Sequence, residues 1–483
     1  MTIDPASVAG KTLDVAERTD VLVVGAGGAG IAAALDARRQ GAAVVLVDEN
    51  PVPAETMGDD IPMLWGGAAS GAARNRTAMT EALLAARPGL ATAVEAGVDV
   101  RLGTSCWGLY ANGPSVGWLP GPIAGLADET RAWLLGVGRV VVAAGCRDMG
   151  VAFAGWDLPG VAGVQAAASL AALGAFAPRR AVLLGTSDAA LAAADILIAA
   201  GVTIVAVVEV AAPLADAGRL GAPVLCGHRV VRAEGGIDGV TALVVASATG
   251  ERRLACDAVL LGIGTVPVIE LLDAAGCRIV FDPGRGHVPL LDAAGRTSLP
   301  FVSAVGGCAG DFPAQPDIAA YRMAWVEALV LDGADDVHVC RCEDVTARDI
   351  LHLRPPRYLH APPSRRNDAS LRALLGEGPP NPDQVKRLTR AGMGVCQGRR
   401  CREQVACLLA LGTGEPLASV PLATHRAPVR PLPLRLAQAV AEPPDMRRHW
   451  DTWFGMYAQY VPYWDVAPTY TAATRPRDPD DVG

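Results

Sequence analysis

The chain has 483 residues, of which 51% are hydrophobic, and a formal net charge of -8. This length suffices for two or three domains with hydrophobic cores, and the negative charge argues against sequence-independent binding of nucleic acid. The N-terminal stretch MTIDPASVAGKTLDVAE carries acids and no apolar core, and Asp188 and Asp195 interrupt the longest apolar tract, so we expect a cytoplasmic protein without a secretory signal or membrane span, peripheral to a membrane at most through a complex.

The first predicted unit lies in TDVLVVGAGGAGIAAALDARRQGAAVVLVDEN and consists of a strand, a glycine turn, a helix and a second strand. Residues 20–24 are β-rich and, after Asp20, apolar; the helix is expected to begin near Gly28, and the second strand, 43–47, is followed by an acid. This G-x-G-x-x-G arrangement places the pyrophosphate of a dinucleotide at a helix N-terminus. The residues expected to bind the dinucleotide are Gly25, Gly27, Gly28, Gly30, Asp48 and Glu49.

Each residue of this fingerprint has a physical task. Gly25 makes the tight turn, Gly27 lets the backbone approach the pyrophosphate, and Gly30 lets the helix pack on the strand. Asp48 is placed to accept hydrogen bonds from a ribose, and Glu49 is the second candidate for that role. An ordinary glycine-rich turn is the alternative, but the complete strand, helix and terminal acid favour a nucleotide.

A second strand, helix and strand are predicted in RRAVLLGTSDAALAAADILIAAGVTIVAVVEV. Gly185 is followed here by Thr, Ser, Asp and Ala, so the later glycines are missing, and the charge of Asp188 would repel a pyrophosphate. We expect the architecture of a nicotinamide-binding domain, with a role in packing rather than in tight NAD(P) binding.

Three later segments complete the first unit. RVVVAAGCRDMGVAFAGWDLPGV is a strand with a crossover, CDAVLLGIGTVPVIELL returns from the second unit, and LPFVSAVGGCAGDF closes the first. One nucleotide domain interrupted by another resembles the flavoprotein reductases with two dinucleotide domains. The resemblance implies FAD in the first domain, with further contacts from Ala144, Gly145, Gly306 and Gly307.

The sequence departs from these reductases at two places. Their closing motif has a Gly-Asp pair whose carboxylate contacts the flavin's ribityl and phosphate region, whereas Gly307 can offer only a backbone amide. The GGQ that relatives place near the flavin ring is reduced to Gly66 and Gly67. No C-x-x-C or C-x4-C pair lies in the nucleotide domains, so we expect no disulfide mechanism of the thioredoxin reductase type.

Four cysteines form two tight pairs near the C-terminus: Cys340 and Cys342 in HVCRCEDVTARDI, and Cys396 and Cys401 in RAGMGVCQGRRC. Four thiolates in two pairs suit a four-cysteine zinc site or a 2Fe-2S cluster. Structural zinc pairs usually have two to four residues between their cysteines, and Cys340 and Cys342 have one. We therefore favour an iron–sulfur cluster held by all four cysteines, with zinc as the alternative.

Three short helices are expected to position these thiols. Thr346 and Asp349 resemble a capping box, Asn381 precedes a proline at the first helical position with Gly392 as the C-terminal cap, and Cys401 begins a third helical stretch. The helix dipole and nearby arginines favour the thiolate form. These arginines are Arg341, Arg399, Arg400 and Arg402.

The spacing C-x-C, 53 residues and C-x4-C, with CRCE and GMGVCQGRRC, is similar to the bacterioferritin-associated-ferredoxin-like 2Fe-2S domain. Together with the fingerprint and GWDLPGV at 155–161, it makes residues 20–415 resemble the alpha subunit of heteromeric FAD-dependent amino-acid dehydrogenases. That group includes opine oxidases, proline and hydroxyproline dehydrogenase complexes and hydrogen cyanide synthase, and it is similar to part of the sarcosine oxidase alpha chain.

This resemblance implies a division of labour between subunits. A glycine-oxidase-like beta subunit with its own FAD removes hydride from a C–N bond, while this chain holds FAD and a 2Fe-2S cluster and passes electrons to a downstream acceptor. Some relatives also hold FMN at the subunit interface. We name no catalytic residue, because none of the seven histidines forms a recognisable dyad with a nucleophile.

Two other classes of function remain open. One is a self-sufficient NAD(P)H-dependent flavoprotein reductase, which requires the turn at 185–190 to bind nucleotide. The other is a non-catalytic scaffold subunit whose degenerate motifs no longer bind flavin.

The predicted fold is α/β, with two interleaved Rossmann-like dinucleotide-binding domains of the flavoprotein disulfide-reductase type, a small helical iron–sulfur domain and an extended tail. The tail combines a proline-rich segment with RRHWDTWFGMYAQYVPYWDVAPTY, where 8 of the 22 aromatic residues lie. It either anchors to this chain or is a docking arm for a catalytic partner. The expected segments are 18–150 (FAD domain, first part), 151–270 (inserted domain), 271–333 (FAD domain, closing part), 334–415 (2Fe-2S domain) and 416–483 (tail).

Overall fold

The computed structural model describes residues 15, 17–51, 75–113, 119–331, 336–356, 358, 371, 373, 378 and 381–438. Gly66, Gly67 and the aromatic segment of the tail lie outside the described residues.

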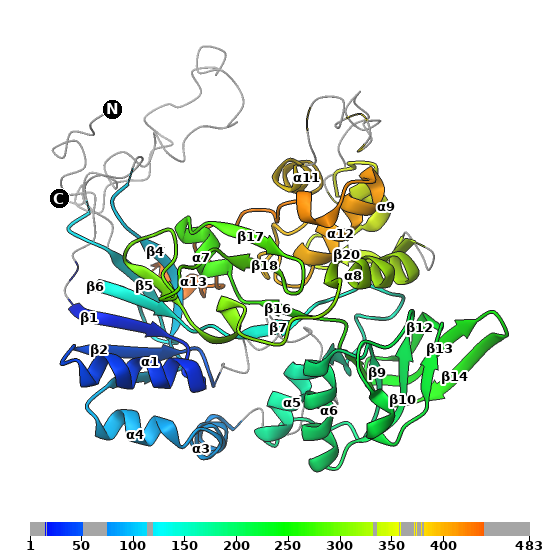
Figure 1. The fold of residues 1–483 in the computed structure, drawn as a ribbon, viewed down its shortest axis with the longest axis horizontal. Helices are drawn as coiled ribbons and strands as arrows, with labels where there is room; N and C mark the ends of the chain where they lie inside the picture. The colour runs from blue at the N-terminus through cyan, green and yellow to red at the C-terminus, as the bar shows by residue number, and fades with distance from the viewer. Residues whose placement is uncertain are drawn as a thin grey trace, which may run out of the picture.

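The first sheet has the strand order β3-β2-β1-β6-β5-β4, and β19 pairs with β6. β1, β2, β3, β6 and β19 pair in parallel, whereas β4 and β5 form antiparallel pairs. Because β19 comes from far along the chain, the sheet is completed only by a segment that follows the second sheet in sequence. The strands are β1 Glu17–Val24, β2 Val44–Asp48, β3 Asp99–Leu102, β4 Ser105–Tyr110, β5 Ile123–Ala127, β6 Ala132–Val142 and β19 Val302–Ala304. The helices beside it are α1 Gly28–Arg39, α3 Arg76–Ala86 and α4 Gly89–Glu95 (Figure 1).

The second sheet has the order β11-β10-β9-β15-β8, and all of its pairs are parallel. An antiparallel three-stranded sheet, β12-β13-β14, projects beside it (Figure 1). The strands are β8 Val161–Gly163, β9 Arg180–Leu184, β10 Thr203–Glu209, β11 Val224–Cys226, β12 Arg229–Gly236, β13 Gly239–Ser247, β14 Gly250–Ala255 and β15 Ala258–Leu261. The helices are α5 Val164–Ala172 and α6 Asp188–Ala199. The predicted fold of two interleaved Rossmann-like units is thereby confirmed.

The two chain crossings between the sheets lie side by side. β7 (Cys146–Asp148) leaves the first sheet and pairs antiparallel with β16 (Thr265–Pro267), which returns from the second. The chain then forms α7 Glu270–Ala275, the hairpin of β17 Ile279–Asp282 and β18 Gly286–Pro289, and α8 Ile318–Val326.

The C-terminal module packs on α8 through α12. The capping box of Thr346 and Asp349 and the Asn381 cap are confirmed. The predicted cap at Gly392 is wrong, because α11 ends earlier and Arg390 is the C-cap, with a left-handed φ of 65°. The module's elements are β20 His338–Cys340, β21 Val345–Thr346, α9 Ala347–Leu351, α11 Pro382–Thr389, α12 Arg402–Thr413 and, farther on, α13 Leu434–Gln438.

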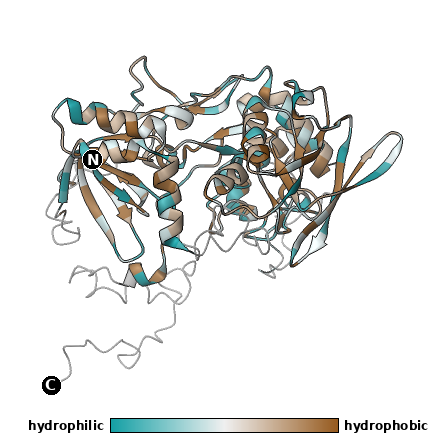
Figure 2. Ribbon diagram, turned by 90° about the horizontal axis from the view of Figure 1, so that it is seen from below, coloured by the Kyte–Doolittle hydropathy of each residue, from teal (hydrophilic) through white to brown (hydrophobic). Residues whose placement is uncertain are grey.

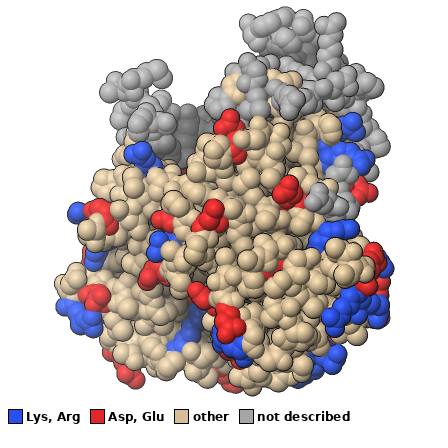
Figure 3. Space-filling model, turned by 45° about the vertical axis from the view of Figure 1, so that its right-hand side comes forward, with Lys and Arg blue, Asp and Glu red and all other residues tan. Residues whose placement is uncertain are grey.

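Hydrophobic residues concentrate on the strands and recur along the helices (Figure 2). Charged residues of both signs are scattered over the face in Figure 3, in small groups rather than in one continuous area of a single sign. Among the described residues, none of the helices combines the length and the apolar character that a membrane crossing requires.

Candidate nucleotide and cysteine sites

The turn between β1 and α1 can be made only by glycine at two positions. Gly25 has a φ of +108°, and a Cβ there would lie 2.3 Å from the carbonyl oxygen of Ala143. A Cβ on Gly30 would lie 1.8 Å from the carbonyl oxygen of Gly25. These contacts bring the end of β6 against the turn, so the fingerprint and the following Ala144 and Gly145 meet as the sequence suggests.

The next glycines face open space instead. A Cβ on Gly27 or Gly28 would meet no atom within 4 Å. Gly27 is the N-cap of α1 and supplies no side-chain cap, so the first amides of the helix stay available to an anion. An open approach and unshared amides fit the pyrophosphate of a dinucleotide.

The acid at the end of β2 already has partners. Asp48 accepts hydrogen bonds from Ala26 N at 2.6 Å and from Asn50 N at 2.8 Å, and it also pairs with the Arg87 guanidinium at 3.0 Å. The Asn50 side-chain amide donates a fourth bond. A carboxylate has about four acceptor positions, so a ribose hydroxyl must replace one of the side-chain donors.

Glu49, the second candidate for the ribose, forms a two-point ion pair with Arg430, at 2.7 and 3.2 Å. The segment next to Arg430 also reaches the cysteine module, because Arg399 Nη1 donates to the carbonyl oxygen of Val429 at 2.9 Å. Residues 429–430 therefore link the nucleotide turn to the cysteine loop. Sequence reasoning missed this link, since nothing in the spacing pairs residue 49 with residue 430.

The structure gives a steric reason for the missing aspartate in the closing motif. A Cβ on Gly307 would lie 3.0 Å from Cys146 N and 3.1 Å from its Sγ. Gly306 lies against the first turn of α1, since its Cβ would be 2.8 Å from the Cβ of Ala29. Gly306, Gly307 and Gly145 thus border the same turn, and the Cys146 thiol stands where a larger residue would have to fit.

The four predicted cluster cysteines are brought together in two pairs. The free thiols of Cys340 and Cys401 are hydrogen-bonded to each other, and so are those of Cys342 and Cys396. The described residues contain no group of three or more His, Cys, Asp or Glu side chains arranged to hold a single metal ion. Two pairs match a binuclear cluster, in which each iron takes two thiolates.

The surroundings of these thiols favour ionisation at one member of each pair. The hydrogen bond from the Cys342 thiol lowers the pKa of Cys396 to about 6, and the charges of Arg399 and Arg400 act in the same direction. The hydrogen bond from the Cys401 thiol lowers the pKa of Cys340 in the same way. Arg402 also pairs with Asp273 at 3.0 Å.

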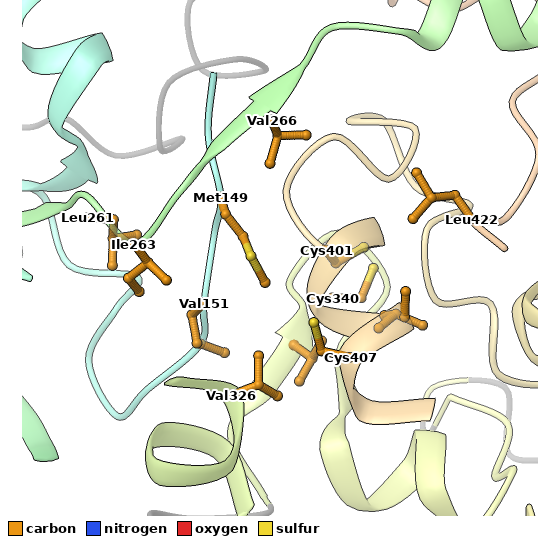
Figure 4. Close-up of a cluster of buried hydrophobic side chains, with 14 of the residues drawn as sticks. Met149, Val151, Leu261, Ile263, Val266, Val326, Cys340, Cys401, Cys407 and Leu422 are labelled. Carbon is orange, nitrogen blue, oxygen red and sulfur yellow. The ribbon is translucent and has the colours of Figure 1, made fainter. Parts of the chain in front are cut away.

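The cysteine loop is attached directly to the crossover that follows Gly145. Arg147 Nε donates to the carbonyl oxygen of Arg399 at 3.0 Å, and Ala152 N donates to the side chain of Gln404 at 2.9 Å. A Cβ on Gly150 would lie 2.6 Å from the carbonyl oxygen of Arg400. Figure 4 shows the apolar part of this contact, in which Met149 and Val151 of the crossover face the cysteine module, where Cys340, Cys401 and Cys407 are among the labelled residues.

Arg147 also joins two buried acids. Its guanidinium pairs with Glu270, which is 1% exposed, and with Glu403 at 3.3 Å. Burial would raise the pKa of Glu270, but the charges of Arg147, His425 and Arg430 outweigh it and hold that pKa well below its usual value. These acids come from α7 and α12, so Arg147 fixes the cysteine module to the nucleotide domain.

Replacing Arg147 with methionine should therefore destabilise the fold by about 3 kcal/mol, because a buried carboxylate loses its main partner. Urea unfolding measures the loss. Arg39→Met, which removes an exposed pair with Asp36, should change stability by less than about 1 kcal/mol. Adding Glu270→Gln to Arg147→Met should recover part of the loss. Equal effects of the two single variants would contradict this role of Arg147.

The corresponding turn of the second sheet is closed by its own side chains. Ser187 caps α6 by accepting from Ala190 N, and Thr186 donates to Glu209 at 2.8 Å. Glu209, at the end of β10, is fully buried and also accepts from the Tyr321 hydroxyl at 2.7 Å. Burial raises the pKa of Glu209. The acid at the position that corresponds to the ribose acid is therefore buried and hydrogen-bonded within the protein.

The fold and the first turn define a class of protein. Residues 19–328 match the family model described as pyridine nucleotide-disulphide oxidoreductase, and the chain belongs to this family. It is a FAD-dependent oxidoreductase. The prediction of a flavoprotein oxidoreductase is thereby confirmed.

Individual relatives cover nearly the whole chain. The opine oxidase A-type subunit of Agrobacterium tumefaciens (strain Ach5) is 27% identical over 507 residues, covering 91% of this chain and 94% of that protein. The sarcosine oxidase alpha chain of Rhizobium meliloti (strain 1021) is 27% identical over 441 residues, covering 84% of this chain and 41% of the relative. The crystal structure of L-proline dehydrogenase from P. horikoshii has a TM-score of 0.55 at 21% identity, covering 87% of this chain and 80% of that one, which shows a shared fold.

Proposed function

We propose that the chain is the electron-transfer subunit of a heteromeric dehydrogenase or oxidase that oxidises the C–N bond of an amino acid, an opine or a related secondary amine. It holds FAD and a 2Fe-2S cluster. The chemistry on the amine takes place mainly on a glycine-oxidase-like, FAD-containing beta subunit. The protein is cytoplasmic, with membrane contact only through its complex, and FMN at the subunit interface is a further part of the proposal.

One observation carries this proposal. The match to a protein named as one of the subunits of an opine oxidase runs over 94% of that protein and 91% of this chain, including the cysteine module. Because nearly all of that subunit is matched by nearly all of this chain, the match supports a subunit role for this chain as well.

The geometry of the two sites supports an assignment of residues to each group. Gly27, Gly28 and the first amides of α1 would hold the FAD pyrophosphate, with Asp48 toward the ribose. The four paired thiols would hold the cluster. When bound, FAD accepts the electron pair of a hydride and a 2Fe-2S cluster carries single electrons. The contact of Arg147 with the Arg399 carbonyl keeps the two sites in a fixed relation.

A self-sufficient NAD(P)H-dependent reductase is a weaker candidate. In the second domain, the Ser187 side chain already caps the N-terminus of α6. The acid at the end of β10, Glu209, already accepts hydrogen bonds from Thr186 and Tyr321. A pyrophosphate would have to displace these bonds and lie beside Asp188. A scaffold without cofactors is also less well supported, because the approach to Gly27 is open.

The proposal is tested by producing the chain with and without a glycine-oxidase-like, FAD-containing flavoprotein from the same organism. The two chains should copurify, and the complex should reduce a dye with an amine substrate such as proline, sarcosine or an opine. The chain alone should oxidise none of them. Turnover of these amines by the isolated chain would contradict the assignment of amine chemistry to the partner.

A further inference from the structure

The cysteine module exposes two large apolar side chains directly beside a partly exposed thiol. Met393 is 40% exposed and Val395 is 54% exposed. Between them, Gly394 lies against Cys342 so closely that a Cβ there would be 2.2 Å from the cysteine Cβ. Cys342 is also the cluster cysteine that is not buried. The pair of thiols containing Cys342 therefore approaches the surface under residues 393–395.

The two stretches of chain that carry the four cysteines have a local excess of positive charge. Within 338–356 and 381–402, the side chains that are not buried include seven cations and two acids, although the chain as a whole carries -8. The cations are Arg341, Arg348, Arg354, Lys386, Arg387, Arg390 and Arg400. The acids are Asp344 and Asp383.

Four of these cations lie beside the loop. Arg341 and Arg400 are close enough for their charges to interact, and Arg341 also interacts with Cys342 and with the exposed Asp157. The carbonyl oxygen of Arg390 accepts a hydrogen bond from Met393 N, and the Arg390 guanidinium pairs with Glu343 at 2.6 Å. Arg387 is exposed on α11 one turn earlier. Arg390 and Arg341 are partly neutralised by these acids, whereas Arg387 has no ion pair among the described residues.

We propose that Met393, Val395 and the surrounding Arg341, Arg387, Arg390 and Arg400 form the docking surface for a one-electron carrier protein with an acidic face. This inference rests on the proposed function. An apolar centre with a charged rim suits a transient redox encounter, in which complementary charge raises the association rate and sets orientation. One electron would pass from the reduced cluster to the oxidised metal of the carrier, with no proton transferred.

The test measures binding as well as electron transfer. The soluble domain of cytochrome b5 serves as an acidic carrier and cytochrome c as a basic one. The full chain should bind the cytochrome b5 domain, with affinity that falls as salt rises, and it should bind cytochrome c at least tenfold more weakly. After photoreduction of the chain, electron transfer to cytochrome b5 should show the same salt dependence in stopped-flow experiments.

Val395→Glu should weaken binding of cytochrome b5 about tenfold, because it places a like charge at the centre of the contact. Val94→Glu is a matched control, since Val94 is 57% exposed on α4 of the other domain. Arg387→Glu on α11, outside residues 393–395, gives a second test and should also weaken binding. Iron and labile sulfide are measured on each variant, so loss of the cluster is distinguished from loss of docking. Equal binding by the Val395 and Val94 variants, or equal affinity for the two cytochromes, would overturn the inference.

Discussion

Replacing Cys342 with serine should remove most of the iron–sulfur absorption while leaving the flavin spectrum in place. A 2Fe-2S cluster needs all four thiolates, and Cys342 belongs to one of the two thiol pairs. The residues expected to bind the flavin pyrophosphate lie in the turn from Gly25 to Gly30, which does not include either cysteine of this pair. Absorption spectra with iron and sulfide analysis of anaerobically prepared protein measure the change.

A matched variant is Cys226→Ser, because Cys226 is an exposed free thiol in the second domain. It should retain the full cluster signal. Stoichiometric zinc without iron or labile sulfide in the unaltered chain would contradict the cluster and would show that the four cysteines bind zinc.

Gly27→Val should abolish FAD binding while leaving the protein folded. The backbone at Gly27 has a φ of -73°, which valine adopts without strain, and no atom lies within 4 Å of the new Cβ. The branched side chain would occupy the space through which the pyrophosphate approaches the helix. Flavin content per folded chain, with circular dichroism to check the fold, measures the effect.

Gly113→Val is the control, because a Cβ at that exposed loop position also meets nothing within 4 Å. It should keep full flavin occupancy. Gly30→Val is expected to misfold, since its Cβ would lie 1.8 Å from a carbonyl oxygen. Full occupancy in Gly27→Val would mean that the nucleotide lies elsewhere.

The strand, turn and helix of the first unit could be predicted from the sequence because the local pattern determines each piece. Apolar β-rich residues end at Gly25, the helix begins at Gly28 as predicted, and the next strand ends at Asp48. The interleaving could be predicted because the returning segments carry their own motifs. The helix starts at Thr346 and Asn381 follow from capping chemistry in the same way.

Contacts between distant segments could not be predicted. The partners of Arg147, Glu49 and Arg430 depend on tertiary packing, and one sequence gives no signal for pairs separated by hundreds of residues. The end of α11 was misplaced because Arg390 adopts the left-handed conformation that a glycine was expected to supply. The reason for Gly307 also required the structure, since it depends on the position of the Cys146 thiol.

The proposed function is tested most directly by the absorption spectrum of the anaerobically purified chain before and after addition of NADH, with iron and labile sulfide measured on the same sample. We expect a flavin spectrum overlaid by broad iron–sulfur bands, iron and sulfide in equal amounts, and no bleaching by NADH. A colourless protein would contradict the electron-transfer role and favour a scaffold, and rapid bleaching by NADH would instead identify a self-sufficient reductase.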